Sequence, residues 1–168
     1  MGEHMKRFLL VLLLAFTTTA LHAQAKFAIY GTGGAERIGI ANNNWKPAGI
    51  VGVYVGLAKL GPLALSGDAR ADLSTDANSG LFGPRLALKL PVLPLKPYAE
   101  FLFGFSNYTS FGSTSRNATG FAYRGVAGID TTILPHLDWR VVDFSIGRIP
   151  DVVSSNNINV STGIVLRF

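Results

Sequence analysis

The chain has 168 residues, enough for one domain, and its lack of cysteine excludes a disulfide framework, a lipid-modified cysteine and a thiolate metal site. Charged residues make up only 15% of it, and the net charge of +5 is spread along the sequence without a basic cluster. This distribution argues against a nucleic-acid partner.

The first 25 residues have the layout of a secretory signal. Lys6 and Arg7 precede an apolar run from Phe8 to Phe16, and small and polar residues follow it. The run is too short to anchor the chain in a bilayer. We therefore expect a signal peptide over residues 1–25 that is cleaved in the mature protein.

The exact cleavage site is open between Ala23 and Ala25, which both end a small-residue motif. Residues 1–4 look like an upstream start or a cloning remnant, and we expect Met5 to be the natural initiator. The mature domain is expected to span residues 26–168.

Turn-forming residues divide the mature chain into eight segments of alternating character. The expected strands are Lys26–Arg37, Pro47–Lys59, Leu63–Ser74, Gly80–Val92, Lys96–Tyr108, Gly120–Leu134, Leu137–Gly147 and Asn157–Phe168. Short connections with a proline alternate strictly with longer connections rich in Asn, Ser, Gly and Thr. In an antiparallel meander, this alternation places the long loops at one end and the short turns at the other.

Ionisable residues keep to one face of each expected strand, because side chains alternate between faces at every residue. Glu100, for example, shares a face with Tyr98 and opposes Phe101 and Phe103. The charged face carries Asp68, Arg70, Arg85, Glu100, Arg124, Asp130, Arg140 and Asp143.

Three positions depart from this pattern. The seventh segment keeps its alternation only if a one-residue bulge lies near Val141 and Val142. Lys59 and Arg148 lie on the uncharged face near strand ends, where a long side chain can reach polar surroundings.

The composition of the two faces decides which one points inward. One face is apolar, and the other mixes small residues with charges of both signs, which suits the narrow lumen of an eight-stranded barrel. We therefore predict an all-β fold, an eight-stranded antiparallel up-and-down transmembrane β-barrel with its apolar face toward lipid. A soluble lipocalin-like ligand-binding barrel, with the faces inverted, is the alternative.

The final strand, NVSTGIVLRF, ends on Phe168, and residues 96–106 read KPYAEFLFGFS. With the meander, these patterns resemble the small eight-stranded outer-membrane barrels of Gram-negative bacteria, of the OmpA, OmpX and opacity-protein type. The resemblance implies insertion by the barrel-assembly machinery, with Ile164, Leu166 and Phe168 as the assembly signal. It also implies an outer-membrane location. The sequence shows no peptidoglycan-binding segment after Phe168, so that function of full-length OmpA is not expected.

No motif indicates catalysis, a metal or a cofactor. The glycine-rich stretch from Gly31 to Glu36 has a glutamate where a nucleotide loop needs its third glycine, and no helix pattern follows. His136 lies in a proline turn without an expected partner, and the spacing of Asp72, Asp76 and Asp151 does not match a calcium loop. We expect no enzymatic activity.

Two functional classes remain open. The first is a structural or surface-interaction protein that acts through its outer loops, with a lumen plugged by the paired charges. The second is a narrow passive porin-like channel. The expected partners are outer-membrane lipid and lipopolysaccharide, with no nucleic acid, and the protein is expected to be a monomer. Candidate lipopolysaccharide contacts at the outer strand ends are Arg37, Lys46, Arg116 and Arg148.

Overall fold

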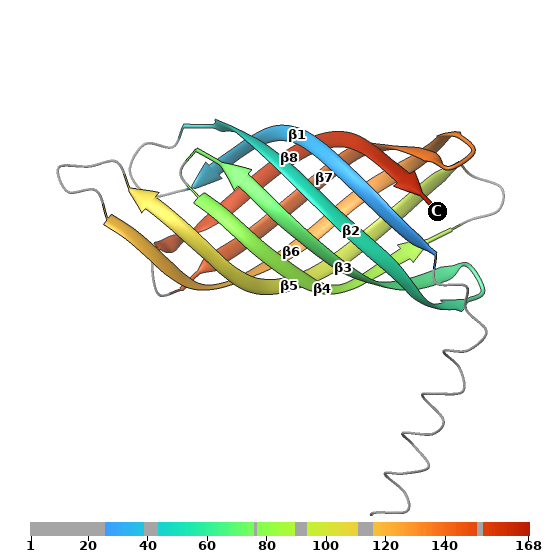
Figure 1. The fold of residues 1–168 in the computed structure, drawn as a ribbon, viewed down its shortest axis with the longest axis horizontal. Coiled ribbons are helices and arrows are strands. Elements are labelled where there is room, and N and C mark those ends of the chain that lie inside the picture. Colours follow the sequence, from blue (N-terminus) through green and yellow to red (C-terminus); the bar gives the residue numbers. More distant parts are fainter. Residues whose placement is uncertain (1–25, 39–43, 76, 90–93, 111–115, 151–152) are drawn as a thin grey trace, which may run out of the picture.

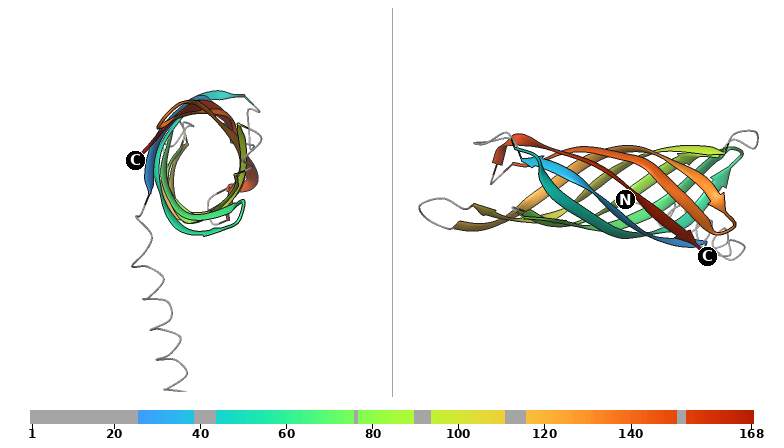
Figure 2. Two further views of the ribbon diagram at one scale, coloured as in Figure 1. Left: turned by 90° about the vertical axis from the view of Figure 1, so that its right-hand side faces the viewer. Right: turned by 90° about the horizontal axis from the view of Figure 1, so that it is seen from above.

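The computed structural model describes residues 26–38, 44–75, 77–89, 94–110, 116–150 and 153–168, so the expected signal peptide lies outside it. Eight strands make up the fold (Figure 1): β1 (Phe27–Ile38), β2 (Lys46–Leu60), β3 (Leu63–Ser74), β4 (Ala77–Leu88), β5 (Leu95–Ser110), β6 (Arg116–Leu134), β7 (Leu137–Ile149) and β8 (Val153–Arg167). Each strand pairs antiparallel with the next, and β8 pairs with β1. The view along the axis in Figure 2 shows the closed ring of strands. This closed meander confirms the predicted fold class.

The wall of the barrel has an apolar outer face and a polar inner face. The side chain of Phe101 is 56% exposed on the outside, whereas its neighbour Glu100 is only 6% exposed. A lipocalin-like barrel would place the apolar residues inside, so the inverted alternative is wrong. In the described parts of the chain, no helix is long and apolar enough to cross a membrane.

The two ends of the barrel differ in their connections. The end where β1 begins and β8 stops, here called the terminal end, also carries the turns Gly61–Pro62 and Pro135–His136. The opposite end, here called the loop end, carries the connections that follow β1, β3, β5 and β7. The hairpin of β5 and β6 extends farthest beyond the barrel at the loop end (Figure 1).

The expected strict alternation of long and short connections is wrong. Only Thr75 and Asp76 separate β3 from β4 at the loop end, whereas residues 89–94 separate β4 from β5 at the terminal end. Several polar stretches expected to be loops continue as strands, since pairing between β5 and β6 reaches Ser110 and Arg116. Backbone pairing at these positions satisfies donors and acceptors that a loop would leave to water.

Register shifts occur at several places in the sheet, and two of them change which face a charged residue occupies. The register of β7 shifts between Arg140 and Asp143, where the sequence predicts a bulge, and both residues are buried on the inner face. A second shift, between Gly56 and Ala58, sets Lys59 opposite the inward residue Ala64. Directly opposed residues share a face, so Lys59 lies on the inner side and is no exception to the charge pattern.

Candidate functional site in the barrel lumen

All eight predicted lumen residues are buried on the inner face of the barrel. They come from the five consecutive strands β3 to β7. Arg140 and Asp143, on either side of the bulge in β7, are fully enclosed at 0% exposure. Burying an isolated charge costs several kcal/mol of folding free energy, so these residues need partners of opposite charge.

Six of the eight form a closed ring of alternating charge, here called the charge ring. Around the lumen, its members follow one another in the order Arg70, Glu100, Arg85, Asp130, Arg140 and Asp143. Arg70 contacts Glu100 and lies 3.4 Å from Asp143, which closes the ring. Every arginine therefore has two carboxylates beside it, and every carboxylate has two arginines.

The other ring contacts lie between 2.7 and 3.4 Å. Arg85 donates to Glu100 at 2.9 Å and to Asp130 at 2.7 Å. Arg140 donates to Asp130 at 3.0 Å and to Asp143 at 3.4 Å. Such paired, charge-assisted hydrogen bonds offset the desolvation of the buried ions.

Tyrosines from other strands separate the arginines, in an arrangement here called the tyrosine–arginine stack. Arg140 lies between the rings of Tyr30 and Tyr98, with its guanidinium carbon 4.1 and 4.7 Å from their centroids. Arg85 lies between Tyr98 and Tyr54, at 4.0 and 4.4 Å. These cation–π contacts add to the ion pairs and fill the lumen between the charged groups.

The hydroxyl groups of two tyrosines fix the carboxylates. Tyr98 donates to Asp143 at 2.6 Å, and Tyr30 donates to Asp68 at 2.8 Å. Asp68 also lies 3.7 Å from Arg70, so it is attached to the charge ring as a seventh charged residue. The sequence places Tyr98 on the charged face, but it did not predict that Tyr30 and Tyr54 contact the arginines.

Glycines make room for these rings on the inner wall. A Cβ atom added to Gly52 would collide with the ring of Tyr30, and one added to Gly128 would collide with the ring of Tyr98. Both glycines lie on strands next to the tyrosine that covers them, as their pairings with Tyr30 and Tyr98 show. A larger residue at either position would displace the stack.

Smaller ion clusters lie on either side of the charge ring. Toward the loop end, Arg124 donates to Asp72 at 2.5 Å and to Glu36 at 3.3 Å. Glu36 belongs to the glycine-rich stretch, and its position on the same face of β1 as Tyr30 is the signal that could have revealed its role.

Toward the terminal end, Asp138 pairs with Lys96 at 2.8 Å and with Arg167 at 2.9 Å. Between Arg124 and the charge ring, the buried side chains of Leu102 and Val126 also occupy the lumen. The inner wall thus carries packed groups along much of its described length.

In the part of the chain that the structure describes, the charged residues of the lumen are paired with one another. Their carboxylates are engaged by arginines or a lysine, and no histidine lies among them. His136 lies in a turn at the terminal end, where its Nδ1 is 3.0 Å from the carbonyl oxygen of Arg167. Within the described ranges, no cluster of three or more acidic or histidine side chains could hold a metal ion, while Asp76 and Asp151 lie outside these ranges.

Comparison with solved structures relates this architecture to known proteins. The Neisserial surface protein A has a TM-score of 0.56 at 12% identity, covering 87% of this chain and 98% of that one. The N-terminal β-barrel domain of OprF from Pseudomonas aeruginosa also scores 0.56 at 12% identity, with coverages of 86% and 100%. The attachment invasion locus protein Ail of Yersinia pestis scores 0.52 at 13% identity, with coverages of 87% and 100%.

The chain has the fold of the small eight-stranded outer-membrane barrels. At these identities, the likeness concerns the fold alone. The sequence matches no protein-family model, and a comparison with curated proteins finds no similar sequence.

The last strand of this outer-membrane-type barrel and the residue after it direct three large apolar side chains outward, whereas Val165 lies buried on the inner face. Ile164, Leu166 and Phe168 are 54%, 43% and 59% exposed, which fits a face in contact with lipid. The ring of Phe168 stacks on Phe27 with centroids 4.7 Å apart, and its backbone N–H donates to the carbonyl of Phe27. The terminal aromatic residue therefore helps to join β8 to β1.

The four residues predicted to contact lipopolysaccharide, here called the rim cations, lie toward the loop end of the barrel. Arg37 near the end of β1 lies over the ring of Trp45 at 5.9 Å, and Lys46 begins β2. Arg148 is exposed, and its Nε donates to Asn156 at 2.7 Å. Arg116 begins β6, but its side chain lies outside the described part of the structure.

Proposed function

We propose that this protein is an integral outer-membrane barrel that carries no ion path, and that it acts as a structural or surface-interaction protein through its loop end. The observation that carries the proposal is the closed charge ring braced by the tyrosine–arginine stack. Eight strands enclose a lumen just wide enough for side chains to fill, so paired charges of this size act as a plug. An ion could pass only by separating pairs that lie between 2.7 and 3.4 Å apart.

The proposed orientation places the loop end at the cell surface and the terminal end in the periplasm. Outer-membrane barrels generally carry short turns on the periplasmic side, and two of the three connections at the terminal end have only two residues. The projecting β5–β6 hairpin is then the part of the protein most available to partners outside the cell (Figure 1). The outward residues Ile164, Leu166 and Phe168 are proposed as the signal that the barrel-assembly machinery reads. Nothing in the lumen chemistry supports catalysis, so we expect no enzymatic activity.

Three measurements test the proposal. The native protein should co-fractionate with the outer membrane, begin near Lys26 on N-terminal sequencing, and migrate differently on a detergent gel before and after boiling. In planar lipid bilayers, the purified barrel should give no stepwise ion currents. Reproducible currents would instead support the narrow channel, and recovery from the soluble periplasm would refute membrane insertion.

The rim cations lead to a separate prediction about lipopolysaccharide. If they contact its phosphates, replacing Arg116 and Arg148 with glutamine should reduce the lipopolysaccharide retained during purification. Raised salt should have the same effect on the parent protein, because exposed contacts of this kind are screened. The matched control replaces both residues with lysine, which keeps the charge and should keep most of the bound lipopolysaccharide. Equal retention by the glutamine variant and the parent at both salt levels would rule out this role.

A further inference from the structure

A hollow lies at the terminal end of the barrel, away from the loops. It is a cavity of about 910 Å³ whose lining comes from β1, β2, β3, β8 and the connections after β4 and β6. Tyr54 and Ser66 line it on the lumen side. Because the ring of Tyr54 covers Arg85 at 4.4 Å, one end of the tyrosine–arginine stack contributes to the floor. The cavity is thus a compartment of its own beyond the charge ring.

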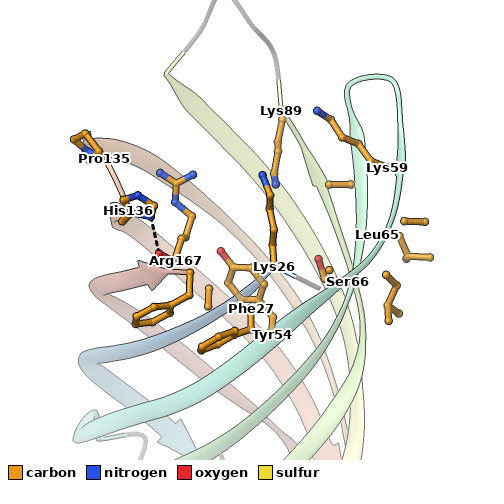
Figure 3. A pocket seen from close by; sticks show the side chains of 16 residues that line it. Lys26, Phe27, Tyr54, Lys59, Leu65, Ser66, Lys89, Pro135, His136 and Arg167 are labelled. Atoms are coloured by element: carbon orange, nitrogen blue, oxygen red, sulfur yellow. Dashed lines mark hydrogen bonds between the residues drawn. The ribbon is translucent and has the colours of Figure 1, made fainter. Parts of the chain in front are cut away.

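Four cations line this cavity, and we call them together the basic mouth. They are Lys26, Lys59, Lys89 and Arg167, and they come from segments far apart in the sequence. In Figure 3 the lysine side chains of Lys26 and Lys89 extend toward one another across the opening, with Lys59 and Arg167 on opposite sides. Lys59 faces inward only because of the bulge after Gly56.

The side chains that line the basic mouth include no carboxylate to match its three lysines. No aspartate or glutamate is among the residues that line it, and the nearby Asp138 is already engaged by Lys96 and Arg167. Within the described residues, no carboxylate forms an ion pair with Lys26, Lys59 or Lys89. The lumen charges are closely paired, whereas among the described residues these three lysines have no side-chain carboxylate as a partner.

The lysines also affect one another. The walls of the mouth withdraw the Lys89 ammonium from water, which lowers the pKa of Lys89, and the neighbouring cations Lys96, Arg85, Arg167 and Lys59 lower it further. An anion bound among them would supply the missing counter-charge and favour the charged form.

We propose that the basic mouth binds a phosphate-bearing anion, with the headgroup of an anionic phospholipid as its source. Phosphate oxygens accept charge-assisted hydrogen bonds from several lysines and an arginine at once. The volume suits a headgroup-sized molecule better than a single small ion, since small-molecule sites measure roughly 300–1,000 Å³. Apolar residues at the edge favour a lipid over a soluble anion, because Phe27, Leu57 and Leu65 line the cavity and are exposed on the lipid-facing surface.

In the proposed orientation, this lipid belongs to the periplasmic leaflet, so the choice of leaflet rests on the proposed function. The binding chemistry does not, because it can be measured on the refolded barrel in detergent. A failure of binding would leave the membrane assignment intact. A failure of membrane insertion would not by itself remove the anion site.

The experiment compares the parent with two variants of the full mature chain, refolded without lipid. The first carries Lys59→Gln and Lys89→Gln, and the second carries Lys59→Arg and Lys89→Arg as the charge-preserving control. Since these lysines form no ion pair within the described residues, both variants should fold, which heat-modifiable gel migration checks. Binding of inorganic pyrophosphate is measured by calorimetry at low salt. Retention of anionic phosphatidylglycerol relative to phosphatidylcholine is measured by native mass spectrometry from nanodiscs of mixed composition.

The glutamine variant should retain phosphatidylglycerol at least about tenfold less than the parent, and the arginine variant should resemble the parent. Pyrophosphate binding that falls in the same way supports the shared phosphate chemistry. If the glutamine variant loses pyrophosphate binding but retains phosphatidylglycerol like the parent, the anion site is supported. That result would overturn the proposal that a lipid headgroup is the bound anion. If neither ligand distinguishes the glutamine variant from the parent, the basic mouth is no anion site.

Discussion

Replacing Glu100 with leucine is expected to lower the free energy of unfolding by about 3–5 kcal/mol, because the substitution leaves buried arginines without a shared counter-ion. Glu100 contacts Arg70 and lies 2.9 Å from Arg85 in the charge ring. Both guanidinium groups would remain enclosed beside a leucine that can accept no hydrogen bond. The measurement is the urea midpoint of the folded barrel in detergent or lipid, followed by the mobility of unboiled samples on a gel. Bilayer recordings on the same variant should still show no currents, since its other ring pairs remain.

The matched control is the double variant Glu100→Leu with Arg85→Met. Removing Arg85 as well takes away one stranded cation and leaves Asp130 with its partner Arg140 at 3.0 Å. The double variant should therefore lose less stability than the sum of the two single variants, as expected for residues in one network. Strict additivity would mean that Glu100 and Arg85 do not stabilise each other. A single variant as stable as the parent would contradict the pairing itself.

Replacing Gly128 with alanine is expected to lower the free energy of unfolding by about 1–3 kcal/mol through overpacking. The added methyl group would meet the ring and hydroxyl of Tyr98 and the carbonyl oxygen of Val142. A flexible side chain could move aside at little cost, but Tyr98 is held by its hydrogen bond to Asp143 and by the guanidinium groups around it. The change would therefore disturb the stack as a whole.

Gly80 provides the matched control for this substitution. It also lies in a strand, but it is exposed and an added Cβ would meet nothing within 4 Å. Gly80→Ala should change stability by no more than about 0.5 kcal/mol, the usual range for exposed positions. Equal effects at Gly80 and Gly128 would show that backbone freedom, and not the contact with Tyr98, accounts for the loss.

The parts of the lumen depend on one another. The charge ring and the tyrosine–arginine stack share Arg85 and Arg140, so a change in either set reaches the other. Such a braced interior leaves little freedom for opening and closing. We therefore expect specific interactions at the two ends, with the rim cations at one and the basic mouth at the other.

Alternation along the chain predicts the barrel and places its eight lumen charges on the inner face, although it misplaces Lys59. Strand side chains alternate strictly between faces, so the parity of Glu100 or Arg124 relative to neighbouring phenylalanines assigns them to one side. The same rule located the bulge in β7, because Asp143 could share a face with Arg140 only if one residue were inserted. That face carries many small residues together with charges of both signs, which indicates a narrow lumen.

Which charges meet, and where the strands end, follows from the closed barrel and not from any one strand. Asp143 lies 3.4 Å from Arg70 across a separation of 73 residues, a contact that depends on the curvature of the closed barrel and the register of every strand between them. Strand ends such as Ser110 depend on pairing with a partner strand, which local composition does not report. The bulge that turns Lys59 inward leaves no mark in the alternation of its own strand, since it lies at the very end. Alternation is a local property of one strand, whereas the charge ring and the basic mouth arise only when eight strands close around a common axis.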